Sequence, residues 1–172
     1  MKTKRVLKEI YSWSKVILFG LLLAFFIKNT VVASAKVPTG SMEGTVMTGS
    51  RIIINRLAYL YGNPQRGDIV AFYYPDDGQT LYLKRIVGLP GETIEGIDSK
   101  IYIDGTQIKD FTENEFDENF GPFVIPENCY FMMGDNRNNS WDSRYWKNKF
   151  VDMQEIIGKA ELEYYPQLKI LK

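Results

Sequence analysis

The sequence has no histidine and only one cysteine among its 172 residues. Without histidine, the chain cannot form a Ser-His-Asp triad, a Cys-His pair or a histidine-ligated zinc site. A single cysteine, Cys129, excludes a disulfide within the chain. Cys129 lies in the stretch ENCYFMMG, where we expect it to be a small apolar residue of a buried strand. A nucleophilic site in this protein therefore needs a base other than histidine.

An excess of charge is also lacking, since 21 lysine and arginine residues balance 21 acidic residues. Domains that bind nucleic acid usually carry a basic surface, so we expect no nucleic-acid partner. Hydrophobic residues make up 45% of the chain, which is enough for a core. The length fits one domain with an appendage.

The appendage is the N-terminal segment, in which basic residues precede an uncharged apolar run at residues 16–27. Twelve residues are too few to cross ~30 Å of hydrocarbon, but apolar flanks extend the stretch to about residues 12–32. Lys28 can reach an interface along its own aliphatic chain. The basic flank places the N-terminus in the cytoplasm. The sequence therefore predicts one transmembrane helix, with the rest of the chain outside the cytoplasm.

A cleavable signal peptide is the alternative interpretation of this segment. Ala33, Ser34 and Ala35 follow the apolar run, as small residues do at a signal-peptide cleavage site. Both interpretations place the remainder of the chain outside the cytoplasm. We favour an uncleaved anchor, with a cytoplasmic basic tail and anchor at residues 1–35 and an extracytoplasmic β-rich domain at residues 36–172.

From residue 36 onward the sequence indicates β-structure. Short apolar or alternating runs are bounded by Gly, Pro, Asn and Asp in residues 50–62, 67–75, 81–91, 100–110, 128–135 and 158–166. The run IYIDGTQI is typical of a hairpin with Asp104 and Gly105 at its turn. Residues 111–123 are acidic and rich in turn formers, and we expect a surface loop there. The fold class is mainly β: an antiparallel barrel-like or sandwich-like domain behind one N-terminal transmembrane helix.

Ser41, in the stretch KVPTGSMEGTVMTG, would need an unusual base to act as a nucleophile. Lys84 is the notable basic residue, because it lies in QTLYLKRIVGLPGE, a strand whose two faces are both mostly apolar. The ends of Lys84 and Arg85 could reach solvent at a sheet edge. If Lys84 is buried instead, its pKa falls, and its neutral amine can take the proton of a serine hydroxyl. A buried Arg85 stays charged and needs a carboxylate.

A third stretch, residues 130–146, runs from an apolar strand into a dense polar loop. A calcium loop is excluded, because Arg137, Ser140 and Trp146 stand where a ligand, a glycine and a glutamate are required. A glycosylation acceptor at Asn138 and a plain solvated loop remain open interpretations. The loop could instead supply carboxylates for Arg85 and a hydroxyl for a lysine base.

Together, the three stretches resemble one family, the type I signal peptidases, which are bacterial Ser/Lys proteases. PTGSMEGT resembles the box of the nucleophile, RGDIVAF and YLKRIVGLPGE resemble the boxes around the lysine, and MGDNRNNSWDSR resembles the final box. The boxes follow in the family's order behind an N-terminal anchor. The short insert before the final box is similar to that of the compact Gram-positive type.

The resemblance implies catalytic roles for the matching residues. Ser41 corresponds to the nucleophile that is acylated, and Lys84 to the general base. Thr39 corresponds to the hydroxyl residue that forms the oxyanion hole together with the backbone N–H of Ser41. Ser140 corresponds to the hydroxyl that orients the lysine.

The resemblance also implies supporting residues around the catalytic pair. Asp142 and Arg144 correspond to a structural ion pair, and Asp135 is expected to pair with Arg85. The residues expected to line the substrate pocket are Val37, Met42, Tyr82 and Leu83.

The resemblance finally implies substrates and a location. The substrates are signal peptides of secretory preproteins, bound as an added β-strand and cut after Ala-x-Ala sites, with no metal or cofactor. The lipid bilayer is a second partner, and contact with the export translocon is a further expectation. The chain would cross a bacterial cell membrane once. Because residues 33–35 resemble such a cleavage site, slow cleavage after Ala35 between molecules is a hypothesis.

Two other classes of protein remain as alternatives. A self-cleaving Ser/Lys repressor protease would need a helical DNA-binding domain, for which the sequence gives no indication. A non-catalytic anchored β-domain would leave Ser41 and Lys84 far apart, or Lys84 in solvent. The distance between these two residues and the exposure of Lys84 therefore separate the last alternative from an enzyme.

Overall fold

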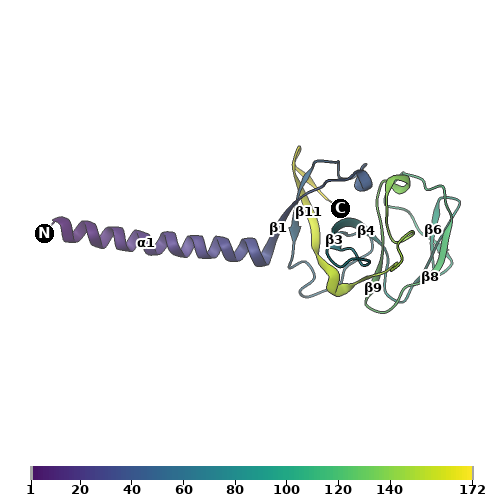
Figure 1. Ribbon diagram of the computed structural model, residues 1–172, viewed down its shortest axis with the longest axis horizontal. Helices are drawn as coiled ribbons and strands as arrows, with labels where there is room; N and C mark the ends of the chain where they lie inside the picture. Colours follow the sequence, from purple (N-terminus) through teal and green to yellow (C-terminus); the bar gives the residue numbers. More distant parts are fainter. Residues whose placement is uncertain (1, 172) are drawn as a thin grey trace.

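In the computed structural model, residues 2–171 are described, apart from the side chains of residues 2–8 and 10. Helix α1 (Lys2–Phe26) continues into the π-helical turn η1 (Ile27–Val31) and extends away from the β-strands as a single rod (Figure 1). The stretch Tyr11–Val31 has a mean hydropathy of 1.6 and no buried residues, and it is long and apolar enough to cross a membrane. An apolar helix was therefore predicted correctly. The predicted basic flank rests on side chains at residues 2–8 that lie outside the description.

The rest of the chain forms two antiparallel sheets, as the sequence predicts. The larger sheet has the order β1-β2-β11-β3-β4-β9-β10, with β12 paired to β11. Its strands are β1 (Val32–Lys36), β2 (Arg51–Asn55), β3 (Ile69–Tyr73), β4 (Leu81–Gly88), β9 (Cys129–Met133), β10 (Val151–Asp152), β11 (Ile156–Tyr165) and β12 (Lys169–Ile170). The smaller sheet has the order β7-β6-β5-β8, from β5 (Thr93–Ile97), β6 (Lys100–Ile103), β7 (Thr106–Gln107) and β8 (Phe120–Val124).

The hairpin at Asp104 and Gly105 is confirmed. Ile103 pairs with Thr106, and the two turn residues have φ angles of 51° and 75°. Positive φ at both central residues is what a tight two-residue hairpin turn requires.

The prediction of a surface loop at residues 111–123 is wrong for the end of this segment, which forms a strand. Phe116 is 3% exposed, and Phe120–Val124 forms β8, which pairs with β5. Gly121 and Pro122 interrupt the local alternation, so the strand is recognisable only from its partner in the chain. The stretch at residues 50–62 is also shorter as a strand than its composition indicates, because β2 ends at Asn55.

The expected division of the chain between residues 35 and 36 falls inside strand β1. Ala35 lies opposite Ile52 of β2, and Ala33 lies opposite Ile54. Both alanines pack against a core cluster that includes Met42. The segment after the apolar helix is therefore an integral edge strand of the larger sheet.

Strand β4 has one edge that is only partly covered. On one side it pairs with β3 from Leu81 to Arg85. On the other side the pairing with β9 begins only at Arg85, opposite Met133. Among the described residues, no strand pairs with residues 81–84 on that side. Residues 81–84 and the segment before Ser41 line the same cleft.

Candidate active site

Ser41 lies in a short 3₁₀ turn, η2 (Gly40–Met42), between β1 and β2. Backbone hydrogen bonds hold the turn in place, from Val37 N to Ser50 O at 2.9 Å and from Gly49 N to Val37 O at 2.8 Å. Met42 is fully buried in the core cluster beneath the turn. Because Val37 and Met42 are held in this way on either side of it, Ser41 has a defined orientation. Ser41 is only 8% exposed.

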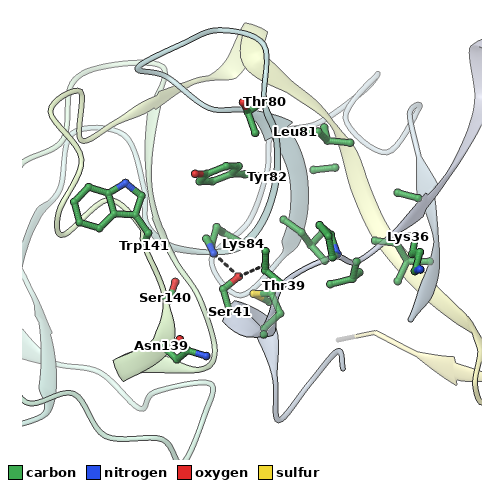
Figure 2. A pocket seen from close by; sticks show the side chains of 18 of the residues that line it. Lys36, Thr39, Ser41, Thr80, Leu81, Tyr82, Lys84, Asn139, Ser140 and Trp141 are labelled. Carbon is green, nitrogen blue, oxygen red and sulfur yellow. Dashed lines mark hydrogen bonds between the residues drawn. The ribbon is translucent and has the colours of Figure 1, made fainter. Parts of the chain in front are cut away.

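Lys84 reaches this serine from the middle of β4. Its Nζ donates a hydrogen bond of 2.5 Å to Ser41 Oγ (Figure 2). Lys84 is only 4% exposed, so its amine does not extend into solvent at a sheet edge. A non-catalytic domain with a solvated lysine far from Ser41 does not fit this geometry.

Burial shifts Lys84 toward its neutral form. Burial lowers the pKa of Lys84 from 10.5 to about 8, because the charged amine loses its hydration. The charge of Asp142 acts in the opposite direction, and the charge of Arg144 lowers the pKa further. A buried lysine with a pKa near neutral is a chemically competent base.

Thr39 places a second hydroxyl next to the hydroxyl of Ser41. Its Oγ1 lies 3.4 Å from Ser41 Oγ, on the side away from the end of the polar loop (Figure 2). The backbone of Thr39 is extended, with φ −124° and ψ 158°. An extended residue is compatible with the β-branched side chain, and its hydroxyl is close enough to bind an oxygen that develops charge near Ser41.

The loop at residues 134–144 carries two buried ion pairs. Arg85 Nη2 lies 2.7 Å from Asp135 Oδ2, and its Nε binds the other carboxylate oxygen at 2.8 Å. Arg144 Nε lies 2.8 Å from Asp142 Oδ1. All four residues are at most 5% exposed. The Arg85–Asp135 pair joins β4 to the loop, whereas the Asp142–Arg144 pair lies within the loop and holds its own conformation.

Ser140 reaches the same cleft but does not bind Lys84. Its Oγ is buried and makes no hydrogen bond. The reason is local packing: the hydroxyl faces Gly134, where any Cβ would collide with it, while Lys84 is directed at Ser41. The expected orienting contact is therefore not formed here, and the orienting role of Ser140 stays a prediction.

Several residues that hold the site were not predicted from the sequence. Asn136 binds the turn of the serine twice, through its backbone N–H to Ser41 O at 3.0 Å and its side-chain amide to Gly40 O at 3.0 Å. Arg137 is fully buried, pairs with Asp110, and donates to Gly134 O at 2.9 Å. The dense polar sequence of this loop indicated a packed loop, but not which partners it would find.

A cleft of about 660 Å³ surrounds the Lys84–Ser41 pair. All four expected pocket residues line this cleft. Three of them, Val37, Met42 and Leu83, pack in one apolar cluster with Ile52, Ile54 and Ala71. Tyr82 also lines the cleft but belongs to another cluster, stacked on Tyr74 with a centroid distance of 4.7 Å. Among the described residues, no group of three or more cysteine, aspartate and glutamate side chains is placed to hold a metal ion.

Comparison with known proteins identifies the family. The family model of signal peptidase, peptidase S26, matches residues 10–165. Signal peptidase I S of Bacillus subtilis (strain 168) is 36% identical over 180 residues, which cover 96% of each chain. Signal peptidase I P of Bacillus subtilis subsp. natto is 34% identical over 96% of this chain and 94% of its own.

A solved structure is also similar. The crystal structure of a signal peptidase I from Enterococcus faecalis V583 is 34% identical and covers 56% of this chain and 96% of its own, with a TM-score of 0.49. The extent of the family match and the identity to relatives over almost the whole chain confirm the resemblance found in the sequence. The chain therefore belongs to the signal peptidase family, peptidase S26, as a type I signal peptidase that removes signal peptides from preproteins.

Proposed function

We propose that the protein is a membrane-anchored serine endopeptidase in which Ser41 is the nucleophile and Lys84 the general base. The observation that carries the proposal is the 2.5 Å hydrogen bond between Lys84 Nζ and Ser41 Oγ, on a lysine that is 4% exposed. With a pKa of about 8, about one Lys84 side chain in ten is neutral at pH 7. A lysine with the ordinary value of 10.5 would be neutral in about one molecule in three thousand.

The reaction proceeds through an acyl-enzyme. Neutral Lys84 accepts the proton of Ser41 while Oγ attacks the scissile carbonyl carbon. The tetrahedral intermediate collapses as the C–N bond breaks, and the Lys84 ammonium gives its proton to the leaving amine. Water then attacks the ester on Ser41 and passes its proton to Lys84. The second tetrahedral intermediate collapses as the bond between its carbon and Ser41 Oγ breaks, and Lys84 returns the proton to Oγ, so that the signal peptide leaves with a free carboxylate.

Two donors stabilise the oxyanion of each tetrahedral intermediate. They are the backbone N–H of Ser41 and the hydroxyl of Thr39, which lies 3.4 Å from Ser41 Oγ. Removing one such donor typically costs about 10²–10³ in rate. The Asp142–Arg144 and Asp135–Arg85 pairs act through positioning, since they fix the loop beside the lysine.

The substrate binds as an extended strand along the open edge of β4 at residues 81–84, in the manner of β-augmentation. Alternate side chains of the strand then face the apolar part of the cleft formed by Val37, Met42 and Leu83. This arrangement supports selection of small residues at the first and third positions before the cut, as in Ala-x-Ala sites. The substrates are the signal peptides of exported preproteins.

The apolar helix anchors the protein in the bacterial cell membrane with its N-terminus in the cytoplasm. The stretch Tyr11–Val31 supports a single crossing, and the basic sequence before it supports the orientation. The β-rich domain after it works outside the cytoplasm, next to the bilayer from which signal peptides are presented. Contact with the export translocon would follow from the same placement.

Cleavage after Ala35 between molecules also remains a proposal. Ala35 is paired with Ile52, so β1 must leave the sheet before another molecule can bind it as a substrate. We therefore expect slow cleavage. Intact-mass analysis of aged wild-type protein should detect a species that starts at Lys36, and this species should be absent from Ser41→Ala; its absence from both would refute the idea.

The proposed function is tested by cleavage of a preprotein with an Ala-x-Ala site, using the full chain in detergent. We expect Ser41→Ala and Lys84→Ala to lose at least about 10³ in kcat/KM, because each removes one half of a unit that acts together. Lys100→Ala is the matched control, since Lys100 is exposed on β6 and lies outside the cleft. Near-wild-type turnover by either dyad variant would refute the assignment.

A further inference from the structure

The cleft extends to both sides of the Lys84–Ser41 pair. At one end lie Lys36 and Leu81, and at the other end lies Trp141, with the pair between them (Figure 2). Val37, next to Lys36 in the chain, belongs to the apolar cluster that lines the cleft. The end near Trp141 has no role in the proposed mechanism so far.

The mechanism determines which end receives which part of the substrate. Lys84 protonates the leaving amine, so the nitrogen of the scissile bond must face Lys84, and the carbonyl oxygen must face Thr39. In Figure 2, Thr39 lies on the Lys36 side of Ser41, whereas Lys84 lies on the side of Trp141. The residues before the cut therefore extend toward Lys36, and the first residues of the released protein leave past Trp141. This inference rests on the proposed function.

The exit side carries a fixed aromatic surface, which we call the aromatic shelf: Tyr82, Trp141 and Tyr145. Trp141 and Tyr145 stack with a centroid distance of 5.6 Å and an interplanar angle of 13°. The indole Nε1 of Trp141 donates to Tyr74 OH at 3.3 Å, and Tyr82 stacks on Tyr74 at 4.7 Å. The shelf is thus held by its own contacts before a substrate arrives.

The shelf nevertheless leaves apolar surface open to the cleft. Trp141 is 55% exposed and Tyr145 is 36% exposed, and both line the same cleft as Ser41. The other lining residues from this part of the chain are polar, namely Glu118, Asn138, Asn139 and Ser140. Among the described residues that line this part of the cleft, the shelf therefore offers a substrate side chain its large apolar contact.

We propose that Trp141, supported by Tyr82 and Tyr145, determines specificity for the first two residues of the released protein and favours a flat or bulky apolar side chain there. Rigid aromatic surfaces bind such side chains with little loss of conformational freedom. The signal-peptide side of the cleft selects small residues, and the exit side selects large ones. The enzyme thus recognises both sides of the bond that it cuts.

The test uses soluble peptides that are identical through an Ala-x-Ala site and carry Phe or Gly at the first or second position after the cut. For wild type in detergent, we expect kcat/KM to be about threefold to tenfold higher with Phe at one of these positions, the range for an aromatic pair. Trp141→Ala should reduce the Phe-to-Gly ratio to below about twofold, whereas Trp141→Phe should retain it. Lys100→Ala, which lies outside the cleft, should leave the ratio as in wild type.

Each other outcome overturns the inference. A wild-type ratio near one would show that the exit side does not select residues. A ratio preserved in Trp141→Ala, or an equal loss for all peptides, would give Trp141 a structural role only, and Trp141→Gln provides the same test if the alanine variant does not fold. A preference seen only with substrates in lipid vesicles would assign Trp141 to the bilayer. If Ser41→Ala also cleaved these peptides, the proposed function itself would fail. This result is distinct from any change in the Phe-to-Gly ratio, which tests only the role of Trp141.

Discussion

The burial of Lys84 predicts that this lysine destabilises the fold. A pKa lowered from 10.5 to about 8 corresponds to a cost of about 3 kcal/mol at neutral pH. Replacement by methionine removes this cost and keeps a similar shape, but loses the hydrogen bond to Ser41, which contributes about 1 kcal/mol. We therefore expect Lys84→Met to raise the free energy of unfolding by about 2 kcal/mol at pH 7.

The pH dependence distinguishes charge from packing. Between pH 8 and 10.5 the unfolded chain binds the Lys84 proton and the folded protein does not, so the wild type gains stability as the pH rises. The advantage of Lys84→Met should therefore be complete below pH 8 and disappear toward pH 10.5. Thermal unfolding in detergent should show a rise of the midpoint by about 4–8 °C at pH 7, and Lys100→Met, at an exposed site, should show almost none. If Lys84→Met raised the unfolding midpoint equally at pH 7 and pH 10.5, or did not raise it at pH 7, the reasoning would be refuted.

Three further substitutions test the surroundings of the proposed catalytic pair, Ser41 and Lys84. Thr39→Val keeps the branched shape but removes the hydroxyl, and should lower kcat by about 10²–10³ with little change in KM in a peptide-cleavage assay. Asp135→Ala removes the carboxylate that Arg85 binds through two nitrogens, and should lower the free energy of unfolding by about 3–5 kcal/mol in denaturant titrations. Gly134→Ala places a Cβ against Ser140 Oγ and the backbone oxygen of Ser41, and should lower both the free energy of unfolding in denaturant titrations and kcat/KM in the peptide-cleavage assay. Wild-type behaviour of any of these variants would contradict the role described for that residue.

The meeting of Lys84 with Ser41 could be foreseen because its signal is local. A lysine in a strand with two apolar faces is unusual in itself, and the absence of histidine leaves few other bases for Ser41. Most strands and the Asp104–Gly105 hairpin could be predicted for the same reason, since alternation and turn residues act over a few neighbours.

The contacts that position the pair could not be foreseen, because they depend on how distant segments pack. Asp110 and Arg137 are 27 residues apart and meet only when the acidic segment folds onto the polar loop. Strand β8 is hidden by Gly121 and Pro122 until its pairing with β5 is known. The same holds for Ser140, whose hydroxyl faces Gly134 because of close packing that no sequence pattern records.

The central claim is that a neutral Lys84 activates Ser41, and the pH dependence of kcat/KM tests it most directly. This quantity reports the pKa of the free enzyme's base. We predict a tenfold rise per pH unit at low pH and a plateau, with the inflection between about pH 7 and 9, because the pKa of Lys84 is about 8. A rate that keeps rising through pH 10, as for a lysine of ordinary pKa, or a rate that does not depend on pH in this range, would contradict the account.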